Sequence, residues 1–299
     1  MHVDLYIALA GLIVGFAVGL TGMGGGALMT PVLVLIFNVQ PLAAVSSDLV
    51  ASLLMKPLGA MVHVGHRTVR WGLVRWLALG SVPGALMGVS FLRLFGKGHT
   101  VQSVVSVALG SVLLLSVTAL AGKWVFDRSR SVDAASADET FEVKRAATAV
   151  LGLVVGFIVG ITATGSGTLI IVALMLIYPR LRGSQTVGTD LTQAIPMVGA
   201  AALGHILFGD FKFGLTMSIV LGAIPGVVAG SLLSARGSTG FIRAALSVVL
   251  LASGLKLVNV PTPVIGIAAV VAVVAAAGVY IVRRTEPRQQ ASAELLEAS

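Results

Sequence analysis

The sequence contains no cysteine, few aromatic residues and little charge. Without cysteine the chain can form no disulfide bond and offers no thiolate as a nucleophile or metal ligand. Charged residues make up 11% of the 299 positions and aromatic residues 6%, whereas about 25% of a soluble domain is charged. These shortages argue against an ordinary soluble domain.

Apolar residues fill the space that charge leaves. Hydrophobic residues account for 57% of the chain and the mean hydropathy is +1.01. They form long, nearly uncharged runs, most of which reach the roughly 20 residues that a membrane-spanning helix needs. The composition predicts an all-α polytopic membrane protein. The runs cover residues 5–37, 43–64, 71–92, 101–120, 146–178, 186–208, 213–233, 241–255 and 264–282.

The net charge of +8 raises the question of a nucleic-acid partner. The basic residues stand singly or in pairs between the apolar runs and are not clustered with aromatic residues. That distribution is typical of the cytoplasmic loops of a membrane protein. We therefore expect no nucleic-acid partner, and membrane lipid as the surroundings of the chain.

The chain contains its glycine-broken apolar segment twice. Residues 15–26, GFAVGLTGMGGG, return at 156–167 as GFIVGITATGSG, and after one inserted residue the register holds to Gly230. Matched positions include Asp48 with Asp190 and His63 with His205. The two halves therefore should share one fold.

Each half begins with a run of about 33 residues, which is too long for one ordinary span and is interrupted by glycine. Arms such as 27–37 and 168–178 are too short to cross alone, so we expect broken, re-entrant helical hairpins. If both runs are hairpins, 15 of the Lys and Arg residues between the spans lie on the inside and 4 on the outside. If both runs are single crossings, ten lie on the inside and nine on the outside. The hairpin arrangement obeys the preference for positive charge inside.

That arrangement leaves three full spans in each half, so the second half should enter the membrane upside down, as inverted-topology repeats do. We expect the N-terminus outside, the C-terminus in the cytoplasm and the chain in a bacterial inner membrane. The predicted parts are a first repeat (1–122), a cytoplasmic linker (123–145), a second repeat (146–258), an accessory transmembrane helix (259–282) and a cytoplasmic tail (283–299).

The glycine breaks are the first candidate binding site. A helix that starts inside the bilayer directs unpaired amide groups and about half a positive charge at its start, which attracts anions. Close packing of helices is the alternative role of such glycines. The predicted anion-binding residues at the two breaks are Thr21, Gly24, Gly25, Gly26, Thr162, Gly165, Ser166, Gly167 and Thr168.

Ionisable residues on the helices after the hairpins are the second candidate. Asp48 and Asp190 occupy matched positions, and carboxylates inside a span are costly, which makes them candidates for proton coupling or for a structural hydrogen bond. Lys56 has no counterpart, since Val198 stands at its matched position. It is expected to pair with Asp48 or to give a bound anion a fixed positive charge. For the two histidines we expect an interfacial structural role, and neither a metal site nor a cofactor is predicted.

The motif GLTGMGGGALMTPVL at 19–33, the SSDL sequence at 46–49 and VPGALMG at 82–88 resemble the sulfite exporter TauE/SafE family of membrane permeases. The resemblance covers residues 5–258 and implies transport of sulfur-containing anions such as sulfite or organosulfonates, usually as export. The second glycine motif contains fewer glycines than the first. The two aspartates stand where the resemblance leads us to expect Ser, Thr or Asn, which favours protons that accompany the anion.

The sequence thus favours a secondary transporter that is not an enzyme, takes a small anion and has protons as the candidate coupling ion. An anion channel and an uptake permease for another small organic anion stay open as alternatives. An intramembrane enzyme needs a nucleophile and base or a metal cluster, for which only the two separated histidines are available. Oligomeric state, direction and the particular anion do not follow from the residues.

Overall fold

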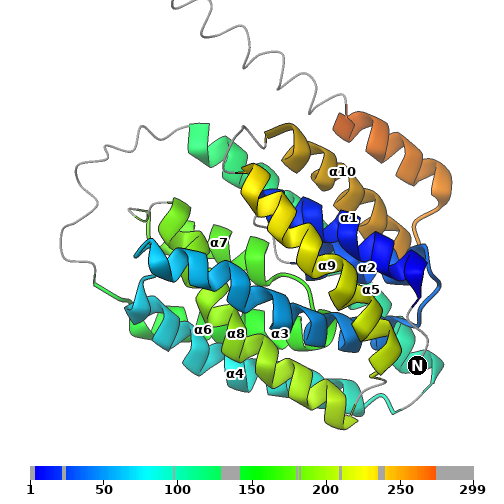
Figure 1. Cartoon of the computed structure of the whole chain (residues 1–299), viewed down its shortest axis with the longest axis horizontal. Coiled ribbons are helices and arrows are strands. Elements are labelled where there is room, and N and C mark those ends of the chain that lie inside the picture. The colour runs from blue at the N-terminus through cyan, green and yellow to red at the C-terminus, as the bar shows by residue number, and fades with distance from the viewer. Residues whose placement is uncertain are drawn as a thin grey trace, which may run out of the picture.

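The structure is a computed structural model, described here for residues 4–21, 25–96, 98–128, 142–179, 181, 183–208, 211–234 and 240–273. Within these ranges the regular structure is all-helical (Figure 1). The named helices are α1 (Leu5–Thr21), α2 (Gly26–Leu35), α3 (Pro41–Gly65), α4 (Trp71–Arg93), α5 (His99–Arg128), α6 (Arg145–Thr162), α7 (Ser166–Ile177), α8 (Gly183–Phe208), α9 (Phe213–Ser234) and α10 (Gly240–Leu257).

Five helices in the described ranges are long and apolar enough to cross a membrane: Pro41–Gly65, Trp71–Arg93, His99–Gly122, Arg145–Thr162 and Phe213–Leu233. Helices α2 and α7 have 10 and 12 residues. At about 1.5 Å per residue, neither could span a hydrocarbon layer of about 30 Å. The long first run of each half is therefore divided into two helices, the second of them short, as the glycines predicted.

Helices α6 and α7 form a hairpin whose two outer ends lie together. Tyr178 directly follows α7, and its hydroxyl accepts a hydrogen bond of 2.9 Å from the Lys144 backbone N–H at the start of α6. The same hydroxyl lies 2.5 Å from the Thr148 hydroxyl. The chain therefore turns back at residues 163–165 and returns to the end from which it started. In the first half, α1 and α2 are separated by a break of which residues 22–24 lie outside the described ranges.

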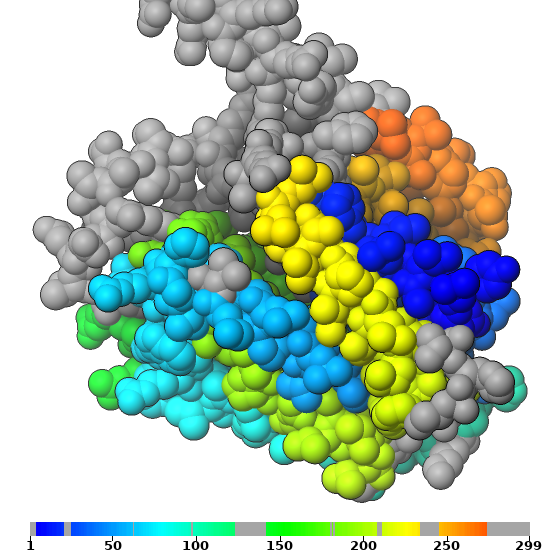
Figure 2. Space-filling model, viewed as in Figure 1, coloured from blue at the N-terminus to red at the C-terminus, as the bar shows by residue number. Residues whose placement is uncertain are grey.

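The first helix of each half packs along the fourth helix of the other half. Side by side in Figure 1 run α1 with α9 and α4 with α6, and in Figure 2 α9 covers one flank of α1. Gly11 lies against Ile219, and Gly19 against Val227 and Ser231, so α1 and α9 are parallel. Glycine lines these contacts because the two backbones touch there.

Helices in corresponding positions cross each other in opposite directions. The start of α3 contacts the end of α8, where Ser46 meets His205, and the end of α3 contacts the start of α8, where His63 meets Gly188. Helices α5 and α10 are also antiparallel, since Gly110 lies against Val258 and Gly254 against Leu114.

Two apolar cores flank this crossing. One is built from buried residues of α4, α6, α7 and α8, the other from buried residues of α1, α2, α9 and α10, and α3 and α5 contribute to both. Each core thus combines the hairpin of one half with the fourth helix of the other half. The inner ends of both hairpins meet beside α3 as a result.

The remaining segments bear on the predicted boundaries. Helix α5 continues to Arg128, beyond the predicted start of the linker at residue 123. A helix over Thr262–Val273 occupies the described part of the predicted accessory segment. Most of the linker and the tail predicted from residue 283 lie outside the described residues.

Candidate functional site

The two helix breaks touch each other inside the protein. The Thr164 hydroxyl, at the second break, donates a hydrogen bond of 2.8 Å to the backbone carbonyl of Gly26, the first residue of α2. A Cβ atom on Gly26 would collide with the carbonyl oxygen of Ala163. Segments 138 residues apart in sequence therefore approach so closely that only glycine fits at the contact.

Local hydrogen bonds shape the second break. Ala163 and Gly165 adopt left-handed conformations, with φ angles of 58° and 106°. The Thr162 hydroxyl donates to the carbonyl of Ile158 and accepts from the amide of Thr164. Helix α7 then begins at Ser166 with no side-chain cap on its amide groups. Its first turn thus faces the meeting point of the two hairpins with unpaired N–H groups, as a helix start does in general.

Asp48 of α3 lies beside the first break and is fully buried. One of its carboxylate oxygens accepts a hydrogen bond of 2.6 Å from the Thr30 hydroxyl of α2, and the same oxygen lies 3.3 Å from the position of a Cβ on Gly26. Its other oxygen, Oδ1, has no hydrogen-bond partner, nor does the buried Ser52 hydroxyl one helical turn later.

Lys56 reaches from α3 to the second break. Its ammonium group donates a hydrogen bond of 2.8 Å to the Ser166 hydroxyl at the start of α7, and the side chain is 8% exposed. The buried carboxylates of Asp48 and Asp190 both lie close enough to interact with this charge. The ammonium group therefore stands at the start of α7, and both roles expected for Lys56 stay predictions.

Asp190 of α8 is buried with 3% exposure. It accepts a hydrogen bond of 3.2 Å from the side-chain amide of Gln193, whose oxygen in turn accepts one from Ser81 of α4. The two aspartates therefore occupy matched positions with different partners: a hydroxyl from a hairpin for Asp48, and an amide from its own helix for Asp190.

Other predicted site residues border the breaks, and one of them faces α5. The Thr168 hydroxyl donates to Ser116 of α5 at 2.8 Å, so it is engaged on the side of that helix. Gly167 is buried within the first turn of α7. Thr21 ends α1 and Gly24 lies outside the described residues. The structure brings Gly25, Gly26, Asp48, Lys56 and Ser166 together around α3.

His205 joins three helices near the end of α8, where it is 1% exposed. Its ring nitrogens lie 2.8 Å from the Ser46 hydroxyl of α3 and 2.8 Å from the Gly160 carbonyl of α6. These hydrogen bonds join the last turn of α8 to α3 and α6, and the position of His205 relative to the membrane interface stays a prediction. At the other end of the crossing, His63 is partly exposed and meets Gly188, the matched position of Ser46.

Sequence reasoning missed Thr30, Gln193 and Ser46. Thr30 belongs to the quoted glycine motif, and its hydroxyl within an apolar stretch was the available signal. Gln193 and Ser46 lack a polar counterpart in the other half of the chain, so a search for repeated polar residues passes over them. The residues at their matched positions are Ala51 and Gly188. For Gln193, the spacing of three residues from its partner aspartate was a usable signal, since side chains at that spacing are neighbours on a helix.

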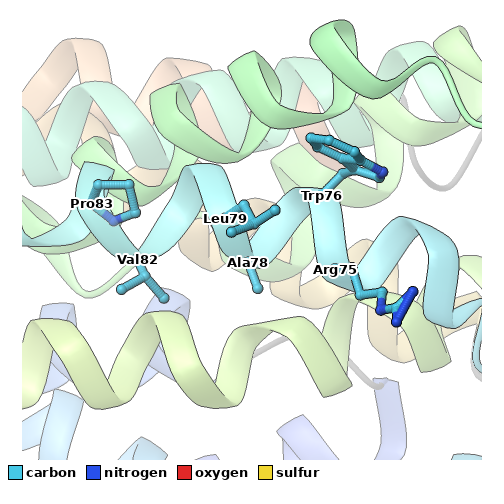
Figure 3. A pocket seen from close by; sticks show the side chains of 6 residues that line it. All are labelled: Arg75, Trp76, Ala78, Leu79, Val82 and Pro83. Atoms are coloured by element: carbon cyan, nitrogen blue, oxygen red, sulfur yellow. The ribbon is translucent and has the colours of Figure 1, made fainter.

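Two hollows in the described part of the protein bear on the candidate site. Beside the first break a cavity of about 10 Å³ is lined by Gly25, Met29 and Met55 among others, which is too small for a sulfur oxyanion. A second pocket, of about 680 Å³, lies along α4 (Figure 3). It is lined by Arg75, Trp76, Ala78, Leu79, Val82 and Pro83. It does not include the described residues of the breaks.

The fold and site define a membrane transporter with interrupted helices. Residues 7–257 match the sulfite exporter TauE/SafE family, and the chain belongs to this family. The resemblance seen in the sequence motifs is thereby confirmed.

Curated relatives agree with this class. The chain is 39% identical over 253 residues to the probable membrane transporter protein YjnA of Bacillus subtilis (strain 168), covering 84% of this chain and 98% of the relative. It is 23% identical over 274 residues to the probable membrane transporter protein YunE of the same organism, covering 84% and 96%. No solved structure matches the chain significantly.

Proposed function

We propose that the protein is a secondary transporter that binds a small sulfur-containing anion, such as sulfite or an organosulfonate, between the two helix breaks and exports it across the cytoplasmic membrane. The observation that carries the proposal is the meeting of the two breaks at Lys56, whose ammonium group bonds the first residue of α7. A buried cation beside the start of a helix favours a bound anion. The sulfur chemistry rests on the family.

The proposed architecture is a pair of inverted-topology repeats, each a re-entrant hairpin with three spans, over residues 1–122 and 146–258. It is supported by the antiparallel crossing of α3 with α8 and of α5 with α10, because corresponding helices of inverted repeats run in opposite directions. The linker 123–145 and the tail from 283 are assigned to the cytoplasm, the N-terminus to the outside, and 259–282 to an accessory span.

Transport requires the site to open to each side in turn. The ends of the α3 and α8 crossing differ: Ser46 bonds His205 at one end, whereas Gly188 faces His63 at the other. We propose that alternating separation of these two ends gives access to the site.

We further propose that protonation of Asp48 or Asp190 couples transport to the proton gradient. Both carboxylates are buried and both act on the charge of Lys56. A proton on either one weakens its hold on Lys56 and leaves that cation free for the anion. Anion and proton binding should therefore favour each other, as linkage requires.

Uptake into proteoliposomes tests the function. Sulfite, sulfate, thiosulfate and small sulfonates are compared as labelled substrates, with and without an imposed pH gradient. We expect saturable uptake of at least one of them, together with counterflow driven by the unlabelled anion. Flux that does not saturate and shows no counterflow would identify a channel instead. The relatives are named transporters, which favours transport over an enzymatic reaction.

Asparagine variants test the proton coupling. Asp48→Asn and Asp190→Asn keep the shape of the side chain but cannot bind a proton, so each variant should lose the response of net uptake to a pH gradient while still exchanging anion at equilibrium. Thr192→Ala, a hydroxyl removal on the same helix as Asp190, serves as a control that should keep both activities. An unchanged response to the pH gradient in the double asparagine variant would remove both carboxylates from the coupling mechanism.

A further inference from the structure

Two oxygen atoms next to the first break are buried without a hydrogen-bond partner. They are Asp48 Oδ1 and Ser52 Oγ, on side chains that are 0% and 3% exposed. Leaving a buried polar group unpaired is destabilising, and each such group calls for an explanation, such as an ion or water that is held there. Asp48 and Ser52 are one helical turn apart, so both oxygens lie on the same side of α3.

Oxygen-bearing side chains of α2 and α3 lie at this spot, next to the terminal methyl group of Met55. Asp48 Oδ2 is bonded to the Thr30 hydroxyl at 2.6 Å, and Ser52 Oγ lies 3.7 Å from the position of a Cβ on Gly25. Carboxylate and hydroxyl oxygens are ligands for hard cations. Interrupted helices are also where transporters hold their coupling ions. The cluster Asp48, Ser52 and Thr30 therefore has the composition of a small cation site.

Lys56 does not fully compensate the negative charge of the Asp48 carboxylate. Lys56 donates its hydrogen bond to Ser166 at 2.8 Å and not to Asp48. One lysine cannot balance two carboxylates. Because the hydrogen bond of Lys56 goes to Ser166, the Asp48 carboxylate has no cation bonded to it among the described residues. A single carboxylate near a lysine suits a monovalent ion better than a divalent one.

The second half of the chain lacks this chemistry. At the positions matched to Ser52 and Lys56 stand Ala194 and Val198. Asp190 is instead bonded by the amide group of Gln193 at 3.2 Å, and an N–H donor cannot ligate a cation. The hydroxyl cluster is therefore not a requirement of the repeated fold, since the fold forms without it in the other half.

We propose that Asp48, Ser52 and Thr30 bind a sodium ion, which competes with a proton for the Asp48 carboxylate. The role of this ion in coupling rests on the proposed transport function, whereas its binding does not. Sodium bound at Asp48 neutralises that carboxylate without occupying Lys56, so the lysine stays available to the anion. The ion and the anion should therefore bind together.

Thermal unfolding of the purified protein in detergent measures the binding without any substrate. Sodium chloride should raise the unfolding temperature in a saturable manner, and potassium or N-methylglucamine chloride at equal ionic strength should not. Acidification should weaken the apparent sodium affinity, because the proton occupies the same carboxylate. Ser52→Ala and Thr30→Val should each weaken that affinity about tenfold, and Asp48→Asn should abolish the effect.

Ser218→Ala provides the matched control. Its hydroxyl is also fully buried in a helix and bonds the Gly214 carbonyl at 2.8 Å, but it lies on α9 away from Asp48 in sequence, and its removal should leave the sodium affinity unchanged. Equal effects of sodium and potassium on the wild type, or the same sodium response in Asp48→Asn, would overturn the proposal. Anion uptake that fails while sodium stabilisation persists would instead count against the transport function alone.

Discussion

Replacing Lys56 with methionine is expected to abolish measurable anion binding. Methionine fills a similar volume but removes the buried cation, so an anion at the breaks would meet Asp48 and Asp190 without compensation. Truncating one member of a buried charge network costs about 2–5 kcal/mol, which corresponds to at least about a thirtyfold loss of affinity. Isothermal titration of the detergent-purified protein with the anion found by the uptake assay would measure it.

Controls separate lost binding from lost folding. Lys56→Arg keeps the charge and should retain part of the affinity, and Lys212→Met, at an exposed position before α9, should bind like the wild type. If Lys56→Met does not fold, the double variant with Asp190→Asn removes the carboxylate left unpaired and should fold without binding the anion. Wild-type affinity in either methionine variant of Lys56 would place the anion elsewhere.

Replacing Gly26 with alanine is expected to have the second large effect. The added methyl group would collide with the Ala163 carbonyl, and backbone atoms cannot move aside as a flexible side chain can. The two hairpins would have to separate, which breaks the hydrogen bond from Thr164 to the Gly26 carbonyl. Overpacking of this kind costs about 1–3 kcal/mol or more. We expect transport to fall below detection and the unfolding temperature to drop.

Gly25→Ala is the matched control one residue earlier. Its methyl group would lie 3.3 Å from the terminal carbon of Met55, which can shift, and Gly25 has an ordinary helical φ of −53°. This variant should therefore fold and retain substantial uptake. If Gly25→Ala and Gly26→Ala behaved alike, the contact between the two breaks would not be the feature on which transport depends.

The repeated glycine motif was enough to predict the division of each long run into two helices, because a short arm and a glycine break are local properties of the sequence. It also pointed to Lys56, through the absence of a matched lysine. The partners of these residues were not predictable. That Thr30 bonds Asp48, that Thr168 turns to α5 and that His205 is buried all depend on which helices pack together, and the repeat register says nothing about packing between the halves.

The packing of the first helix of each half against the fourth helix of the other half also has a consequence for synthesis. Helix α1 leaves the ribosome long before α9, its glycine-contacting partner, and α4 precedes α6 across the whole linker. Until those partners are synthesised, the glycine-lined face of each early helix lies against lipid or insertion machinery. Neither half should therefore reach its native packing alone, and expression of the two halves as separate chains should yield assembled protein only when both are made in the same cell.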